Sequence, residues 1–155
     1  MKAIYGLGLL GIASFQILTT NPCFAQSSSI IPDNTLGNES SQITENFQGL
    51  PIEAITGGVQ RGINLFHSFR QFNVSEGRGA YFFSPNVEIQ NILARVTGGN
   101  RSEILGTLGT LGGSEPNLFL INPNGIVFGE NASLDVGGSF VATTANGIKL
   151  GETAG

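Results

Sequence analysis

The segment Leu118-Phe119-Leu120-Ile121-Asn122-Pro123-Asn124-Gly125-Ile126-Val127-Phe128 consists of two short apolar runs separated by one tight turn. The runs are apolar at every position rather than alternating, which is typical of strands buried among neighbours. Pro123 presets the dihedral of the second turn position, Asn122 can cap the turn, and Gly125 accepts a left-handed exit. The segment therefore predicts a strand, a turn and a second strand, each strand being very short.

Similar short runs, separated by Gly, Asn and Ser, recur along the chain. The 23 glycines indicate frequent turns, and the 40% of hydrophobic residues is too high for a disordered linker. No window shows convincing helical periodicity, although a helical turn at 91–96 is an alternative. We predict strands at 43–47, 59–66, 69–74, 80–83, 87–96, 103–108, 117–121, 126–128, 132–136, 139–143 and 148–150.

This spacing allows a sandwich, a barrel or a solenoid. Strands this short fit the narrow faces of a coil, and Asn and Gly tolerate the left-handed backbone of sharp corners. Hairpin-type alternation is weak. We therefore predict an all-β chain that forms a parallel β-helix, in which each coil buries its inner face by stacking on its neighbours.

The N-terminus reads as an export signal. Residues 1–25 combine Lys2, an apolar stretch at 4–18 and small residues before a cleavage site between Ala25 and Gln26. A polar segment, 26–42, follows. Cleavage would remove Cys23, the only cysteine, so the exported chain would contain no disulfide bond.

No set of residues suggests catalysis. Seven Lys and Arg against eleven Asp and Glu, all scattered, argue against a nucleic-acid partner. His67 is the only histidine, and we expect it to be a hydrogen-bonded structural residue. We predict no catalytic residues, no metal and no cofactor. Phe66, Phe69 and Phe72 recur every third residue and predict a bulged strand covering one end of the core. A carbohydrate-binding platform is the alternative, although the chain lacks Trp.

The stretch 122–129, Asn-Pro-Asn-Gly-Ile-Val-Phe-Gly, resembles the hallmark of the two-partner secretion (TPS) domain of filamentous haemagglutinins, the haemagglutination activity domain family. The resemblance runs from 43 to 150 and includes the stretches 61–69, 72–74, 92–99, 104–108 and 133–140. A second family motif, Asn-Pro-Asn-Leu in some members, corresponds at best to Ser84, Pro85, Asn86 and Val87.

The resemblance implies a right-handed, single-stranded, pectin-lyase-like β-helix with an N-terminal cap over 43–155. It implies a secretion-directing module of an adhesin, exported through the periplasm to the Gram-negative cell surface. The implied partner is an outer-membrane β-barrel transporter with periplasmic recognition domains, and Asn122, Pro123, Asn124 and Gly125 would form the recognition or turn motif. A full-length adhesin would bind a host-cell or carbohydrate ligand.

Because the chain stops at Gly155, we expect a domain truncated at its C-terminus. Two alternatives to the secretion module are a polysaccharide-acting enzyme on the same scaffold and an inactive structural fragment of a split adhesin gene.

Overall fold

The computed structural model of the chain describes residues 28–150. These residues form strands and two short 3-10 helices, which confirms the predicted all-β class. The strands are β1 (Ile30–Pro32), β2 (Ser41–Thr44), β3 (Ile52–Gly57), β4 (Val59–Arg61), β5 (Asn64–Phe72), β6 (Gly79–Ser84), β7 (Asn91–Val96), β8 (Ser102–Ile104), β9 (Thr107–Gly112), β10 (Asn117–Ile121), β11 (Ile126–Phe128), β12 (Ser133–Asp135) and β13 (Phe140–Thr143). The 3-10 helices are η3 (Gly37–Glu39) and η4 (Phe47–Gly49).

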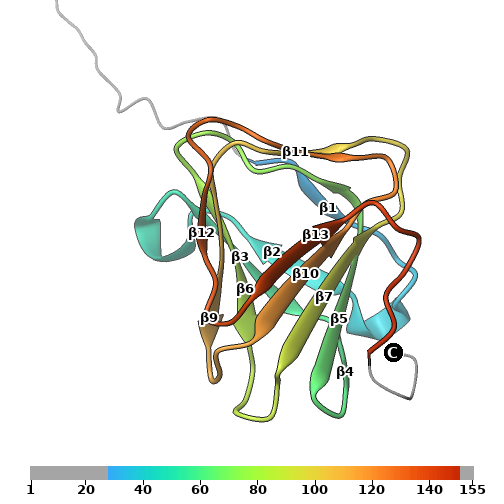
Figure 1. Cartoon of the computed structure of the whole chain (residues 1–155). Coiled ribbons are helices and arrows are strands. Elements are labelled where there is room, and N and C mark those ends of the chain that lie inside the picture. The colour runs from blue at the N-terminus through green and yellow to red at the C-terminus, as the bar shows by residue number, and fades with distance from the viewer. Residues whose placement is uncertain (1–27, 151–155) are drawn as a thin grey trace, which may run out of the picture.

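Three sheets form the sides of a coil (Figure 1). Sheet A has the strand order β1-β5-β7-β10-β13, with β4 also on β5; sheet B has the order β12-β9-β6-β3-β2, and sheet C pairs β11 with β8. The chain visits B, A and C on each of about three turns, and successive turns pair in parallel. In Figure 1 the chain runs counterclockwise as it approaches the viewer, so the coil is right-handed. The predicted parallel β-helix is confirmed.

Equivalent residues of successive coils lie directly beside one another. Asn64, Asn91 and Asn117 are in register on β5, β7 and β10, separated by 27 and 26 residues. The Asn91 side-chain amide donates to Asn64 Oδ1 at 2.9 Å, and that of Asn117 donates to Asn91 Oδ1 at 3.0 Å. One coil is thus 26 or 27 residues long along this asparagine ladder.

The core lies inside the coil, where each sheet contributes alternate side chains. On sheet A, Leu65, Ile92 and Leu118 stack in register and are buried. The rings of Phe69, Phe72 and Phe82 pack together in the first two coils, with the Phe72 and Phe82 centroids 5.8 Å apart. Such stacking removes apolar surface from water on every rung, which is the main stabilising term of the fold.

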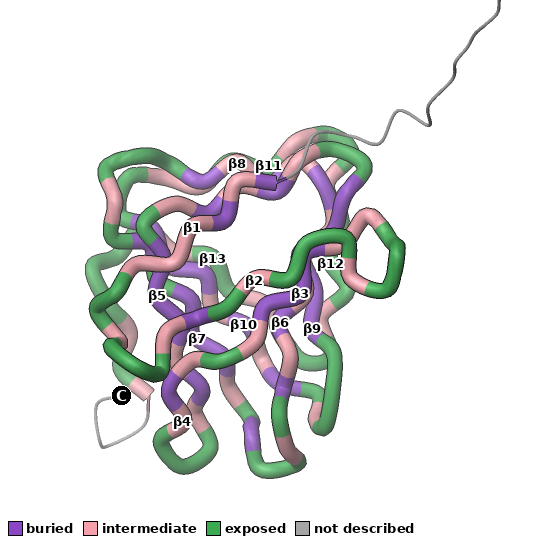
Figure 2. Tube along the Cα trace, turned by 180° about the vertical axis from the view of Figure 1, so that it is seen from behind, coloured by how far each residue is buried: buried purple, intermediate pink, exposed green. Residues whose placement is uncertain are grey.

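Antiparallel strands cover the N-terminal end of the coil (Figure 2). Strand β2 pairs with β3, while β1 and β4 pair with the outer edge of β5. The predicted N-terminal cap is therefore present. The β1–β5 register shifts between Ile31 and Pro32, as predicted for a bulged strand. Phe69 and Phe72 enter the core, whereas Phe66 lies on the opposite face of β5.

Several predicted strand boundaries were wrong, because the coil corners were not recognised. The predicted strand 59–66 is two strands, β4 and β5, joined by a turn at which Gly62 has a φ of 61°. The predicted strand 103–108 is also two, β8 and β9. At the corner between them a Cβ on Gly106 would collide with the carbonyl oxygens of Ser75 and Arg78.

The remaining differences concern strand ends and the cap. The predicted strand 87–96 begins only at Asn91, and 91–96 is a strand rather than a helical turn. No strand forms at 148–150, whereas β1 and β3 were not predicted. Strand β1 belongs to the cap and β3 to the first coil. Pro32 lies in β1 and Pro51 directly precedes β3, and proline is not typical of strand interiors.

Candidate functional site

The turn formed by Asn122, Pro123, Asn124 and Gly125 joins β10 of sheet A to β11 of sheet C. Its backbone closes through a hydrogen bond from Gly125 N to the Asn122 carbonyl at 3.0 Å. Asn122 Oδ1 accepts a second bond from Asn124 N at 2.9 Å. Gly125 has a φ of 115°, in the region that disfavours every residue with a side chain. The turn thus has the geometry that its sequence predicts.

The side chain of Asn122 points into the molecule and is 0% exposed. Its amide donates to the Asn100 carbonyl and to Ser102 Oγ, both at 3.0 Å. These acceptors belong to the corresponding corner of the preceding coil, so Asn122 attaches one corner to the next. Burying this amide is favourable only because each polar atom has a partner.

Two further bonds join the same corners. The Asn124 amide donates to the Gly98 carbonyl at 2.7 Å, and Ser102 N donates to the Gly125 carbonyl at 3.0 Å. The exposed surface of the turn is therefore Pro123 and Asn124, while Asn122 and Gly125 maintain its shape. The side chains of the turn itself, two amides and a proline ring, include no hydroxyl, thiol, carboxylate or imidazole, so what the turn presents is a corner of defined shape.

The second candidate motif lies elsewhere. Ser84, Pro85, Asn86 and Val87 join β6 of sheet B to β7 of sheet A, at the end where the sheet A strands begin. The turn at Asn122 lies where those strands end, so the structure does not bring the two motifs together. Asn86 Oδ1 accepts from Glu88 N at 3.0 Å, the same side-chain cap that Asn122 forms. Val87 is 81% exposed and has no packing role that would explain it.

His67 is a structural residue, as expected. It lies inside the coil beside Phe69 and Phe82, and a hydrogen bond of 2.8 Å joins its Nδ1 to Ser41 Oγ on the cap strand β2. Burial lowers its pKa to about 4, so the ring is neutral at physiological pH. The residue is 2% exposed, and its contacts with Ser41, Phe69 and Phe82 are those of a packed core residue.

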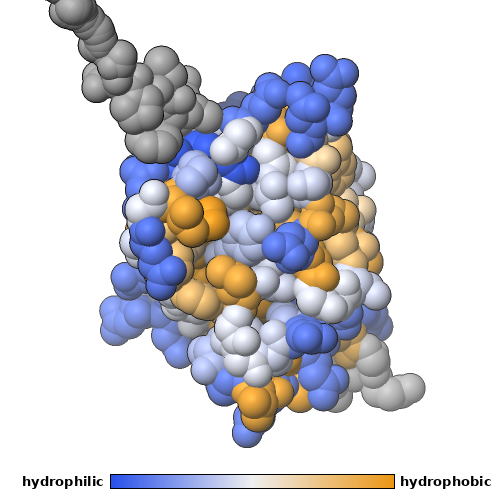
Figure 3. Space-filling view, turned by 90° about the vertical axis from the view of Figure 1, so that its left-hand side faces the viewer, coloured by the Kyte–Doolittle hydropathy of each residue, from blue (hydrophilic) through white to orange (hydrophobic). Residues whose placement is uncertain are grey.

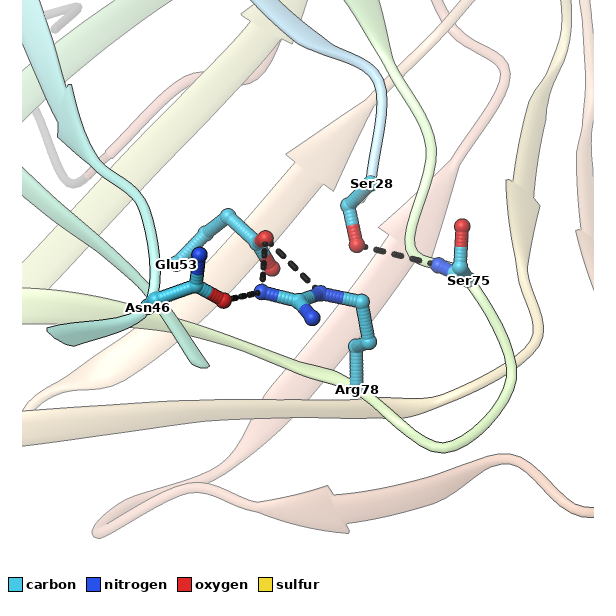
Figure 4. A network of polar contacts seen from close by, with 5 residues as sticks. All are labelled: Ser28, Asn46, Glu53, Ser75 and Arg78. Atoms are coloured by element: carbon cyan, nitrogen blue, oxygen red, sulfur yellow. Dashed lines mark hydrogen bonds and ion pairs between the residues drawn. The ribbon is translucent and has the colours of Figure 1, made fainter. Parts of the chain in front are cut away.

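The buried ion pair between Arg78 and Glu53 was not predicted from the sequence. Arg78, at the corner before β6, reaches Glu53 on β3 through two contacts, Nη2–Oε2 at 2.7 Å and Nε–Oε2 at 2.9 Å (Figure 4). Nη2 also donates to Asn46 Oδ1 at 2.7 Å. Both charged side chains are 1% exposed, so the network joins the cap to the first two coils rather than meeting a substrate. The available signal was Glu53, a charged residue between the apolar residues Ile52 and Ala54.

The remaining sequence predictions concern the cleavage site and the absence of a metal. Ala25 and Gln26, the predicted cleavage site, lie outside the described residues. Within residues 28–150, no three His, Cys, Asp or Glu side chains gather as metal ligands would. No helix in that range is long and apolar enough to cross a membrane.

The family model described as the TPS secretion domain matches residues 28–155, which include all the described strands. No curated protein matches the chain.

Proposed function

The chain belongs to the TPS secretion domain family, and from this premise we propose how it acts as the secretion module of a two-partner exoprotein. Members of this family are modules of exoproteins that leave Gram-negative cells through a two-partner system. In our proposal an outer-membrane β-barrel transporter with periplasmic recognition domains binds this chain after export. The exoprotein is a filamentous-haemagglutinin-like adhesin, and it reaches the cell surface.

The observation that supports this proposal is the turn at Asn122. Its side-chain amides, those of Asn122 and Asn124, donate to the corner of the preceding coil, and its remaining hydrogen bonds close the turn or join neighbouring coils. The sequence of the turn is therefore explained by folding. The turn closes the third coil and presents Pro123 and Asn124 outward. We assign Asn122 and Gly125 to coil closure, and Pro123 and Asn124 to contact with the transporter. The loop at Val87 is a second contact candidate because this apolar side chain projects into solvent.

The test is secretion beside a transporter. The chain is produced together with an outer-membrane transporter of a two-partner system, and the secreted fraction is measured by immunoblotting of medium and cells. We expect Asn122→Ala with Gly125→Ala to reduce secretion at least tenfold. The matched control replaces the same residue types at the exposed pair Asn146 and Gly147, where a Cβ on the glycine meets no atom within 4 Å.

A separate variant tests the contact surface. Pro123→Ala with Asn124→Asp alters the exposed half of the turn, and circular dichroism of the purified chain reports whether the fold is retained. Reduced secretion of a folded variant supports recognition at this corner. Secretion equal to that of the unaltered chain for both double variants would contradict the proposal.

A further inference from the structure

An open cavity of about 600 Å³ lies between the cap segment and the corner that follows β7. Ligand sites in proteins are typically about 300–1,000 Å³ in volume, so the cavity is of that size. Asp33 and Asn34 line it from the segment after β1, Arg70 lines it from near the end of β5, and Thr97 and Gly98 line it from the corner.

Three successive coils bring this cavity beside the turn at Asn122. The Asn124 amide donates to the Gly98 carbonyl at 2.7 Å, and Gly98 in turn lies against Arg70. A Cβ on Gly98 would collide with the Arg70 carbonyl oxygen and would lie 3.2 Å from Arg70 Cγ, so the stem of Arg70 rests on this glycine. The corners from sheet A to sheet C lie side by side at the upper right of Figure 1. A single corner therefore separates Arg70 from the exposed half of the turn.

The Asp33 carboxylate in the cavity has no capacity left for a ligand. Its Oδ1 accepts hydrogen bonds from Thr35 N at 3.0 Å and from Thr35 Oγ1 at 2.7 Å. Its Oδ2 accepts from Ser68 Oγ at 2.8 Å and from Thr97 Oγ1 at 2.5 Å. Although burial alone would raise the pKa of Asp33, these bonds lower it to about 2. A carboxylate accepts about four hydrogen bonds, so the protein itself uses them all.

Arg70 is the charged group of the cavity that remains unused. Within residues 28–150 its guanidinium makes no hydrogen bond and no ion pair. Arg95, which lies nearby, is engaged instead, because it donates to Ser68 Oγ and to Thr35 Oγ1, both at 3.0 Å. What the cavity offers to a ligand is therefore a set of N–H donors on a positive charge, which is complementary to an anion.

The edge around the cavity is basic, although the chain has a net charge of −4. Three of its five arginines lie here, namely Arg70, Arg95 and Arg101, and Arg101 Cβ is 3.6 Å from the position of a Cβ on Gly125 in the turn. The two carboxylates that contact this edge are both engaged: Asp33 by its four donors, and Glu103 by Arg101 at 3.0 Å. Charge complementarity therefore favours an acidic partner.

From these observations we propose that Arg70 binds a carboxylate of the transporter, carried by an Asp or Glu side chain that enters the cavity. A guanidinium can hold a carboxylate through two parallel hydrogen bonds, which fix its orientation as well as neutralise its charge. The inference rests on the proposed secretion role, and it extends the contact surface from Pro123 and Asn124 across one corner to the cap segment.

Binding to the intact transporter tests the role of Arg70. The transporter used to measure secretion is purified in detergent micelles, and the dissociation constant of the exported chain is measured at low and at high salt. We expect Arg70→Gln to weaken binding by about fivefold or more at low salt, and by less at high salt because salt screens the lost charge pair. Arg61→Gln is the control, since this side chain is 66% exposed on β4 and should not affect binding. Circular dichroism checks the fold of both variants.

Cross-linking identifies the partner group. Arg70→Lys places an amine near the position of the guanidinium, and a carbodiimide joins an amine to a carboxylate only when the two are in contact. We expect the Arg70→Lys chain to be linked to an Asp or Glu of the transporter through residue 70, as located by mass spectrometry. Arg61→Lys should give no link between residue 61 and the transporter.

Four results would overturn the inference. If Arg70→Gln binds the transporter as tightly as the unaltered chain, recognition does not use the cavity, while the secretion role stands. A link to the transporter found only at residues other than 70 has the same meaning. If the unaltered chain does not bind the transporter, the inference and the secretion role fail together. If Arg70→Gln weakens retention on heparin but leaves transporter binding unchanged, the cavity is a site for an acidic polysaccharide instead.

Discussion

Tyr81 on β6 donates a hydrogen bond to the carboxylate of Asp135 on β12, at 2.9 Å, although these two strands are not neighbours. Strand β9 lies between them, and its Gly109 is in register with both residues. The ring therefore crosses one whole rung on the outer face of sheet B, the face turned to the viewer in Figure 3. Burial, the hydrogen bond and the charge of Asp135 together raise the pKa of Tyr81 to about 12. The pair ties the second coil to the last one.

The Tyr81 ring can pass over β9 only because residue 109 is a glycine. The first prediction is therefore that Gly109→Ala destabilises the fold. A Cβ there would lie 2.5 Å from Tyr81 Cε2 and 2.6 Å from the Asp135 carbonyl oxygen. Because one of these neighbours is backbone, the rung itself must shift, and we expect a loss of about 1–3 kcal/mol in the free energy of unfolding. Urea denaturation measures this loss. Gly99→Ala is the control, since a Cβ at Gly99 meets nothing within 4 Å; equal stability of the two variants would refute the role of Gly109.

The buried pair of Glu53 and Arg78 gives the second prediction. Glu53→Gln keeps the shape of the side chain but removes the charge that faces a buried guanidinium. Removing one partner of a buried ion pair lowers the free energy of unfolding by about 3–5 kcal/mol, far more than the net value of the intact pair. We expect a loss of this size for Glu53→Gln.

The control is the same substitution in an exposed pair. Glu103 and Arg101 are 3.0 Å apart, with side chains 44% and 59% exposed. Ion pairs of this kind contribute about 0–1 kcal/mol, so Glu103→Gln should change the denaturation midpoint little. Similar losses for both variants would show that burial does not set the importance of the Glu53 pair.

The sequence predicted the features that depend on local chemistry. Short apolar runs and Gly- and Asn-rich corners gave the β-helix, and Asn122 to Gly125 gave the turn that the structure contains. The coil boundaries were harder to predict, because corners such as Gly106 lack a turn motif of their own. They are fixed by the neighbouring coil, whose backbone leaves no room for a Cβ.

Long-range pairing could not be predicted from spacing alone. Arg78 and Glu53 are 25 residues apart and read as two isolated charges, and only the length of one coil brings them together. That length was present in the sequence as the recurrence of Asn64, Asn91 and Asn117 before apolar pairs, a repeat that went unrecognised. Once the repeat is known, residues about 26 or 27 positions apart become neighbours.

The asparagine ladder supports the third prediction. Asn91 is its middle rung, bonded to Asn64 on one side and to Asn117 on the other. Asn91→Ala removes both bonds at once, and with each worth about 0.5–1.5 kcal/mol the expected loss is about 1–3 kcal/mol. Thermal unfolding followed by circular dichroism measures it. Asn38→Ala, in the exposed helix η3, is the control and should leave the melting temperature unchanged.

The last prediction concerns acid stability and depends on His67, the only histidine of the chain. Burial lowers its pKa from 6.5 to about 4, so between these values the unfolded chain binds a proton that the folded chain does not. Stability therefore falls as the pH drops from 6.5 to 4, by an amount on the order of 3 kcal/mol, and is unaffected by this group above 6.5. Asp33 acts in a lower range, because its pKa of about 2 lies below the ordinary value of 3.8.

Urea denaturation at pH 7, 5.5 and 4.5 separates His67 from the rest of the chain. The unaltered chain should lose stability steadily over this range. His67→Gln removes the titrating group, so it should be less stable at pH 7, because Ser41 loses its partner, yet show a much flatter decline toward pH 4.5. Parallel declines in the two proteins would mean that other groups set the acid sensitivity, and that the buried ring does not remain neutral in the folded coil.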